Sequence, residues 1–235
     1  MMNNQKVKHI GIVACSYEGA ALCYKAICNE GALYLGEHAH PEVSLHTYPL
    51  NKYMKHIVAD DWEGVAALMI SSANKLSTIG AEILICPDNT IHQAFSKVKN
   101  AIALPWLHIA EEVTKEAGKN NYRKIGILGT QYLMEGPVYP QKFSAANISY
   151  QTPSEEKRKQ VNNIIFNELV YGIIKKESKE YLLSIVTDFK SEGCDAVVLG
   201  CTELPLIILP NESPLPTLDS TRILARAALK NAITI

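Results

Sequence analysis

Short runs of apolar residues, many of them β-branched, alternate along this chain with longer segments in which apolar residues recur at helical spacing. Strands buried on both faces have this composition, and strands that alternate with helices form parallel sheets covered by helices. We therefore expect an α/β fold. The expected strands cover residues 8–14, 42–47 (ended by Pro49), 81–86, 102–107, 123–129, 147–151 and 195–199; the longer expected helices include 60–76, 155–169 and 176–191.

The strand pattern starts a second time near Ile125, after a turn at residues 118–121. A chain of 235 residues suits one large domain or two small ones and can bury a sizeable core. The restart favours two α/β units of similar build.

Composition excludes several classes of function. The formal net charge is −1 and no run of Lys or Arg is present, so the chain lacks the electrostatic footprint of a protein that binds nucleic acid or an anionic membrane. No apolar stretch approaches the roughly 20 residues that span a bilayer, and the polar start at residues 1–6 indicates no leader peptide. The six cysteines show no C-x-x-C spacing, which favours reduced thiols in a cytoplasm over disulfides or a zinc site.

Cys201 follows the expected strand at 195–199 through Gly200. In open parallel sheets, ligands bind beyond the carboxyl ends of the strands, so a thiol at this position faces a binding crevice. A free cysteine is more often a small buried hydrophobe, and we assign that role to Cys194. For Cys201, the strand-end position and the neighbouring Thr202 favour a functional thiol.

The segments 82–90 and 195–203 match when one is laid over the other. Each has an acidic residue, an apolar strand, a Pro or Gly, and then a reactive group, and Asp88 falls opposite Cys201. A racemase without a cofactor needs two such groups on opposite sides of one carbon, because one removes the α-proton while the other donates a proton to the opposite face. A thiolate suits this role. An aspartate, with an ordinary pKa of about 4, is a weaker base unless burial raises that pKa.

Three motifs carry a resemblance to the cofactor-independent aspartate/glutamate racemase family, which also includes hydantoin racemases, maleate isomerases and arylmalonate decarboxylases. They are Gly200-Cys-Thr-Glu203, Asp88-Asn-Thr90 with the following Ile91-His92, and Leu218-Asp-Ser-Thr-Arg222. The likeness extends over nearly the whole chain in motif order and in length.

The resemblance implies two flavodoxin-like parallel-sheet domains related by a pseudo-twofold axis, with the active site in the cleft between them. It implies a first domain at residues 1–108, a second at 109–212, and a C-terminal helix in 213–235 that packs back on the first. It also implies amino-acid or dicarboxylate substrates, no cofactor and a homodimer.

One position departs from the family's pattern. The family's first motif is Cys-Asn-Thr, whereas this chain has Asp88 in place of the cysteine. Cys86 would point to the same side of an ideal strand, but Pro87 disturbs that geometry, and we favour Asp88 over Cys86. We expect an Asp88/Cys201 acid/base pair in a racemase of aspartate, glutamate or a related small acidic amino acid. The alternatives are a decarboxylase or cis–trans isomerase that uses Cys201 alone, and a ligand-binding homologue without activity.

Small polar residues near these two groups are expected to bind the substrate. Amide and hydroxyl groups can hold an α-carboxylate, and polarising that carboxylate lowers the energy of the carbanion. The candidates are Asn89, Thr90 and Thr202 in the motifs, Ser16 and Thr130 after the first strand of each half, Lys175 as a cation for a distal carboxylate, and Thr47 at the end of the second strand. We interpret His92 and His108 as structural histidines, with His108 the better functional candidate of the two.

Overall fold

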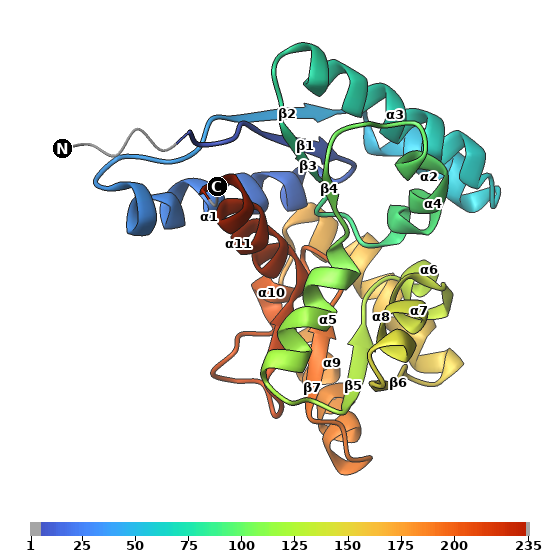
Figure 1. The fold of residues 1–235 in the computed structure, drawn as a ribbon. Coiled ribbons are helices and arrows are strands. Elements are labelled where there is room, and N and C mark those ends of the chain that lie inside the picture. Colours follow the sequence, from blue (N-terminus) through green and yellow to red (C-terminus); the bar gives the residue numbers. More distant parts are fainter. Residues whose placement is uncertain (1–5, 234–235) are drawn as a thin grey trace. The chain divides into compact units, whose positions relative to one another are not determined.

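The computed structural model describes residues 6–233 (Figure 1). Residues 1–5, which contribute to the expectation of no leader peptide, and residues 234 and 235 lie outside the described part. The chain forms two compact units, each with a four-stranded parallel sheet. One unit comprises the residues up to Ile109 together with those from Thr221 onward, and the other comprises Ala110–Ser220. The expected α/β fold with parallel sheets is confirmed.

In the first unit the strand order is β2-β1-β3-β4. The strands are β1 (Ile10–Ala14), β2 (Val43–Thr47), β3 (Ile83–Ile85) and β4 (Trp106–Leu107). All neighbours are parallel, and β1 pairs with both β2 and β3. This order brings the carboxyl ends of the three strands β1, β2 and β3 together at one end of the sheet.

Helices cover both faces of this sheet. On one face, Ile10 and Ile12 belong to an apolar cluster with residues of α1 (Tyr17–Leu35) and α11 (Ser220–Ile233). Successive strand residues point to opposite faces, so Gly11 points to the other face, where a Cβ atom would lie 3.3 Å from Leu76 of α3 (Trp62–Thr78). The remaining helices of this unit are α2 (Leu50–Val58), the 3-10 helix η1 (Thr90–Ala94) and α4 (Phe95–Lys99).

The second unit has the same strand arrangement, with the order β6-β5-β7-β8. Its strands are β5 (Lys124–Leu128), β6 (Ser149–Gln151), β7 (Ala196–Leu199) and β8 (Thr217–Asp219). Its helices are α5 (Ile109–Lys119), α6 (Gln131–Glu135), α7 (Val138–Ala145), α8 (Glu155–Asn167), the 3-10 helix η2 (Leu169–Tyr171), α9 (Lys176–Ser191) and α10 (Leu204–Ile207). The chain passes between the units in the first turn of α5 and again in the first turn of α11.

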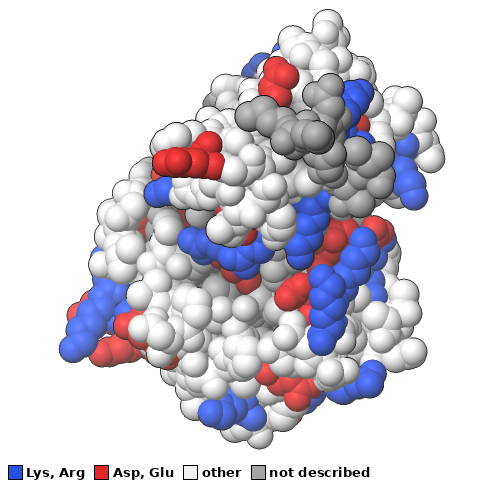
Figure 2. All heavy atoms as spheres, turned by 60° about the vertical axis from the view of Figure 1, so that its left-hand side comes forward, with Lys and Arg blue, Asp and Glu red and all other residues white. Residues whose placement is uncertain are grey.

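The surface of the protein is mixed in charge. Figure 2 shows acidic and basic side chains next to one another over much of the face that it presents, in agreement with the net charge of −1. Within residues 6–233, no helix combines the length and the hydrophobicity that crossing a bilayer requires.

Gly126 in β5 allows α9 to pack closely on the sheet. A Cβ atom at this position would lie 2.7 and 2.8 Å from Cγ and Cε2 of Phe189. We expect Gly126→Ala to lower the free energy of unfolding by about 1–3 kcal/mol, because the buried ring must move to relieve the overlap. Chemical denaturation measures this change.

Gly118 in α5 provides the matched control for Gly126→Ala. No atom lies within 4 Å of a Cβ built at position 118, so Gly118→Ala should raise the free energy of unfolding by about 0.5–1 kcal/mol through helix propensity alone. Equal stability of Gly126→Ala and the wild type would contradict the packing argument.

Candidate active site

In the first unit, the Asp88 carboxylate joins the ends of two neighbouring strands. Asp88 follows β3, and its Oδ2 accepts hydrogen bonds from the backbone N–H groups of Cys15 (3.1 Å) and Ser16 (2.9 Å), which follow β1. Ser16 caps α1, and its hydroxyl oxygen accepts a hydrogen bond from the N–H of Gly19 at 3.4 Å. Two N–H donors and the positive end of α1 therefore stabilise the negative charge of this carboxylate.

Cys86 is poorly suited to proton transfer. Its side chain is fully buried, and its thiol donates to the backbone carbonyl oxygen of Asp88 at 3.8 Å. Burial, followed by the nearby Asp88 charge, raises the pKa of the Cys86 thiol well above its ordinary value. A thiol in such a place stays protonated at neutral pH, which argues for Asp88 over Cys86 as the proton-transfer group of this strand end.

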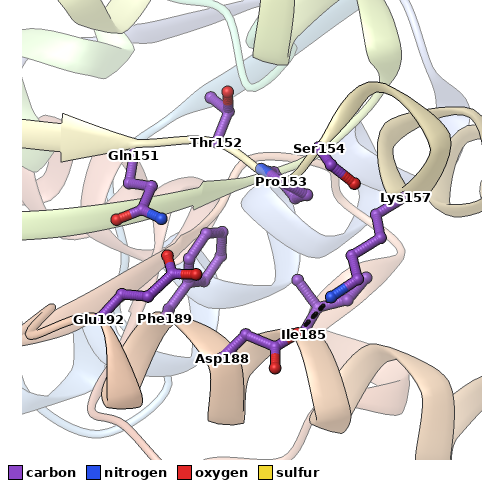
Figure 3. Close-up of a pocket in the computed structure, with 9 residues that line it drawn as sticks. All are labelled: Gln151, Thr152, Pro153, Ser154, Lys157, Ile185, Asp188, Phe189 and Glu192. Carbon is purple, nitrogen blue, oxygen red and sulfur yellow. Dashed lines mark hydrogen bonds and ion pairs between the residues drawn. The ribbon is translucent and has the colours of Figure 1, made fainter.

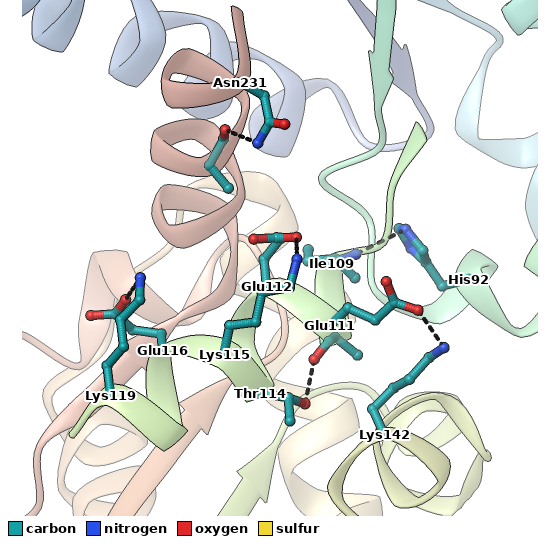
Figure 4. Close-up of polar contacts among 12 residues, drawn as sticks. His92, Ile109, Glu111, Glu112, Thr114, Lys115, Glu116, Lys119, Lys142 and Asn231 are labelled. Carbon is teal, nitrogen blue, oxygen red and sulfur yellow. Dashed lines mark hydrogen bonds and ion pairs between the residues drawn. The ribbon is translucent and has the colours of Figure 1, made fainter. Parts of the chain in front are cut away.

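His92 holds the turn that contains Asp88. The backbone N–H of Ile109 donates to His92 Nε2 at 3.4 Å (Figure 4), so Nε2 is the acceptor and Nδ1 carries the proton. Nδ1 then donates to the carbonyl oxygen of Asp88 at 2.7 Å. The ring is buried and packs edge-on against His108, with 4.6 Å between ring centroids. Both ring nitrogens are thus used to fix the backbone.

Three other predicted binding residues belong to the first unit. Asn89 is buried and precedes η1, and Thr90 is the first residue of η1, so both lie in the Asp88 turn. Thr47 ends β2 and pairs in register with Ala14, the last residue of β1. Its hydroxyl donates to the carbonyl oxygen of Tyr48 at 3.0 Å. All three therefore lie at the same end of the sheet as Asp88.

In the second unit, Cys201 follows β7 next to the end of β5. The N–H of Gly200 donates to the carbonyl oxygen of Leu128 at 2.7 Å, and a Cβ at position 200 would lie 3.2 Å from that oxygen. This close backbone approach favours glycine, and it brings the Cys201 turn beside the residues that follow β5. Thr130 is among them. It is buried, and its hydroxyl oxygen caps α6 by accepting from the N–H of Leu133 at 3.3 Å.

The Cys201 thiol donates a hydrogen bond to the Glu203 carboxylate. Sγ lies 2.9 Å from Oε2, and the same oxygen accepts the Thr202 hydroxyl at 2.8 Å. Glu203 is 3% exposed and Thr202 is 5% exposed, whereas Cys201 is half-buried. A carboxylate in this position can take the thiol proton and leave a thiolate, the form of cysteine that acts as a base.

Two residues of these strand ends are absent from the sequence-based prediction. Glu203 stands two residues after Cys201 in the Gly200-Cys-Thr-Glu203 motif, and that spacing was the available signal for its role. Cys15 is the first residue after β1, and its proximity to Asp88 follows only from the pairing of β1 with β3.

Lys175 forms an ion pair within the second unit. Its ammonium group lies 3.1 Å from Glu168 Oε1, and the Ser178 hydroxyl donates to the other oxygen of the same carboxylate. The hydrogen bond from Ser178 and the Lys175 cation hold the pKa of Glu168 below its ordinary value. The structure thus places Thr130, Cys201 and Thr202 just beyond the ends of β5 and β7, and it pairs Lys175, the residue before α9, with Glu168.

A pocket of about 100 Å³ in the second unit contains none of the predicted residues (Figure 3). It lies between the end of β6, the start of α8 and the side of α9, and the ion pair of Lys157 with Asp188, at 2.6 Å, forms part of its wall. Among residues 6–233, no group of three or more His, Cys, Asp or Glu side chains has the arrangement of a metal site.

Comparison with known proteins identifies the family. The family model described as Asp/Glu/Hydantoin racemase matches residues 18–228, which is most of the chain. The chain belongs to the Asp/Glu/hydantoin racemase family. It is therefore an isomerase of the amino-acid racemase type, and the resemblance found in its motifs is confirmed at the level of the family.

Individual relatives agree with this assignment. The racemase is 24% identical over 194 residues to the broad specificity amino-acid racemase RacX of Bacillus subtilis (strain 168), a match that covers 81% of each chain. It is 30% identical over 151 residues to the glutamate racemase of Listeria monocytogenes serotype 4a (strain HCC23), covering 63% of this chain and 54% of that enzyme.

Solved structures show the same fold. An Asp/Glu racemase candidate from Yersinia pestis superposes with a TM-score of 0.89 at 29% identity, covering 97% of this chain and 100% of that one. An aspartate racemase homologue from Pyrococcus horikoshii OT3 has a TM-score of 0.84 at 29% identity, covering 96% and 99%. The two-sheet architecture of this racemase is therefore that of its family.

Cys201 and Cys86 should differ sharply in reactivity toward iodoacetamide near pH 7. Cys201 is half-buried, whereas Cys86 is fully buried and its thiol pKa is raised. We expect peptide mass spectrometry to find Cys201 modified in the folded protein and Cys86 modified only in denaturant. Modification of Cys86 at the rate of Cys201 in the folded protein would contradict its burial.

Proposed function

We propose that this chain racemises aspartate, glutamate or a related small acidic amino acid with Asp88 and Cys201 as its acid/base pair. The proposal is carried by the 2.9 Å hydrogen bond between the Cys201 thiol and the Glu203 carboxylate at the carboxyl end of β7, in a chain of the racemase family. Two relatives support an amino-acid substrate, since one is named a broad specificity amino-acid racemase and the other a glutamate racemase.

In the proposed reaction, the two groups act on opposite faces of one α-carbon. One removes the α-proton, and the electron pair of the broken C–H bond is delocalised into the α-carboxylate. The other donates its proton to the opposite face. Hydrogen-bond donors around the α-carboxylate stabilise the negative charge that develops there. The residues proposed to hold the substrate are Ser16, Thr47, Asn89, Thr90, Thr130, Lys175 and Thr202.

Glu203 allows Cys201 to act both as an acid and as a base. As an acid, the thiol gives its proton to the carbanion. As a base, it first transfers its proton to the Glu203 carboxylate, to which the S–H group already points. The Thr202 hydroxyl holds the same carboxylate oxygen in place.

One-sided chemistry is the second candidate function. The Asp88 carboxylate accepts two backbone N–H bonds, which favours its ionised form, and a carboxylate is a weaker base than a thiolate. This arrangement favours a decarboxylase or cis–trans isomerase in which Cys201 alone protonates the intermediate. The third candidate is a homologue that binds its ligand without turning it over.

We also propose that the protein works as a homodimer in the cytoplasm and without a cofactor. All six cysteines are free thiols, which suits a reducing compartment. The homodimer and the lack of a cofactor follow from the family resemblance.

Isotope exchange tests the proposed function. The protein is incubated in D₂O with L- and D-aspartate and with L- and D-glutamate, and α-deuteration and chirality are followed by NMR and chiral chromatography. We expect exchange with inversion in the wild type and a loss of at least about 100-fold in Cys201→Ser, because a hydroxyl is a far weaker acid and base at neutral pH.

Cys194→Ser is the matched control for Cys201→Ser. Cys194 is buried before β7, and burial raises the pKa of its thiol, so this variant should keep wild-type exchange. Exchange without inversion would favour one-sided chemistry. Tight binding without any exchange would favour the binding homologue and contradict the racemase.

Asp88→Asn separates the two faces of the reaction. We expect inversion to fall by at least about 100-fold, because the amide cannot accept a proton, while the enantiomer whose α-proton faces Cys201 still exchanges. Deuteration of each enantiomer is measured separately.

Asp195→Asn is the control for Asp88→Asn, because the Asp195 carboxylate also accepts two backbone N–H bonds. Its Oδ2 lies 2.6 Å from the N of Arg123 and 2.9 Å from the N of Lys124, at the amino ends of the strands. Both variants should lose some stability, and only Asp88→Asn should lose inversion. Wild-type racemisation by Asp88→Asn would exclude a catalytic role for this carboxylate.

A further inference from the structure

We infer that Asp88 acts through Cys15, which is the acid/base thiol of the first unit and gives its proton to Asp88; this inference rests on the proposed racemase function and refines the role given there to Asp88. A racemase that works in both directions needs bases of comparable strength on the two faces. The ordinary pKa values of Cys and Asp, about 8.5 and 3.9, differ by more than four units. With a thiol and a neighbouring carboxylate in each unit, the two faces of the α-carbon would meet matched acid/base groups.

The first unit holds four thiols, at positions 15, 23, 28 and 86, and three of them are unsuited to the role. Cys86 is fully buried with a raised thiol pKa. Cys23 is fully buried in the apolar cluster between α1, α11 and the sheet. Cys28 lies further along α1, where burial raises its thiol pKa and Tyr24 is its hydrogen-bonding partner. Cys15, itself only 4% exposed, directly follows β1, and its backbone N–H bonds to the Asp88 carboxylate.

Cys15 and the Asp88 carboxylate are direct neighbours. The backbone nitrogen of Cys15 lies 3.1 Å from Asp88 Oδ2, because β1 and β3 are adjacent parallel strands. Cys15 also immediately precedes Ser16, the N-cap of the 19-residue helix α1. The positive end of a helix stabilises a thiolate in this position.

A buried phenol shares this environment. Tyr53 of α2 is fully buried, and burial, followed by the proximity of the Cys86, Cys15 and Asp88 side chains, raises the pKa of its hydroxyl well above the ordinary value. This hydroxyl therefore keeps its proton. A neutral hydroxyl beside a thiol and a carboxylate leaves the carboxylate as the group that can accept the thiol proton.

The second unit contains the same pair of functional groups. There the Cys201 thiol donates to the Glu203 carboxylate at 2.9 Å. In the strand order, β1 and β3 of the first unit correspond to β5 and β7 of the second. In the first unit the thiol, Cys15, follows β1 and the carboxylate, Asp88, follows β3. Each unit thus carries a thiol and a carboxylate beyond the ends of its central strands.

Each proton in the proposed reaction has a defined donor and acceptor. The S–H proton of Cys15 passes to an oxygen of the Asp88 carboxylate and leaves a thiolate and a carboxylic acid. The thiolate takes the α-proton, so an S–H bond forms, a C–H bond breaks, and the electron pair stays on the substrate. The Cys201 thiol then donates its proton to the opposite face of the α-carbon. Asp88 releases its proton to water, and Cys201 regains one from water.

The test compares Cys15→Ser with Cys86→Ser in the full-length protein, using α-deuteration of each enantiomer. We expect Cys15→Ser to lower exchange at least about 100-fold on the face that Asp88→Asn also loses, and to retain exchange on the Cys201 face. The double variant Cys15→Ser/Asp88→Asn should lose no more than either single variant, because the two residues act as a unit. Cys86→Ser, from the same unit, should stay within about threefold of the wild type.

Three outcomes would overturn the inference. Wild-type exchange of both enantiomers by Cys15→Ser and Cys15→Ala removes Cys15 from the reaction and leaves the proposed function standing. Loss of exchange on both faces, in variants whose melting curves match the wild type, assigns Cys15 to a role other than the base of one face. Absence of exchange in the wild type contradicts the racemase itself and this inference with it.

Discussion

The two hydrogen bonds that the Asp88 carboxylate accepts connect it to residues 73 and 72 positions away in the sequence, Cys15 and Ser16. They form because β1 and β3 are parallel neighbours, so that both strands deliver their following residues to the same end of the sheet. The carboxylate, two peptide N–H groups and the positive end of α1 become one electrostatic unit. His92 fixes the same turn from the other side through the carbonyl oxygen of Asp88. The backbone therefore sets where negative charge is stabilised in the first unit.

The second unit also places a thiol beside a carboxylate, but both groups belong to one turn. Gly200 allows the backbone after β7 to approach Leu128 at the end of β5. The carboxylate partner of Cys201 then comes from the same turn, two residues later, rather than from another strand. Two units with the same strand order thus present a thiol and a carboxylate in different ways.

The predicted strands agree with the structure because central strands of a parallel sheet are buried on both faces and so need continuous apolar runs. β7, at Ala196–Leu199, is buried throughout and was visible as such in the sequence. The second predicted strand ends before Pro49, and no helix is predicted over Leu50–Val58, where α2 forms. Its buried residues Tyr53 and Ile57 are four positions apart, which is helical spacing, so a signal for this short helix is present in the sequence.

The sequence by itself determined the fold class and the family, because strand composition, helical spacing and the Gly200-Cys-Thr-Glu203 motif are local patterns. From the same motifs it predicts a functional Cys201 and an aspartate, Asp88, in place of a catalytic cysteine. Only the tertiary structure decided that Cys86 is fully buried and that the backbone N–H of Cys15 bonds to the Asp88 carboxylate. That outcome depends on the strand order β2-β1-β3-β4, which places residues far apart in the sequence at one end of the sheet. No local pattern encodes such an order, since it arises from how the helices and strands pack together.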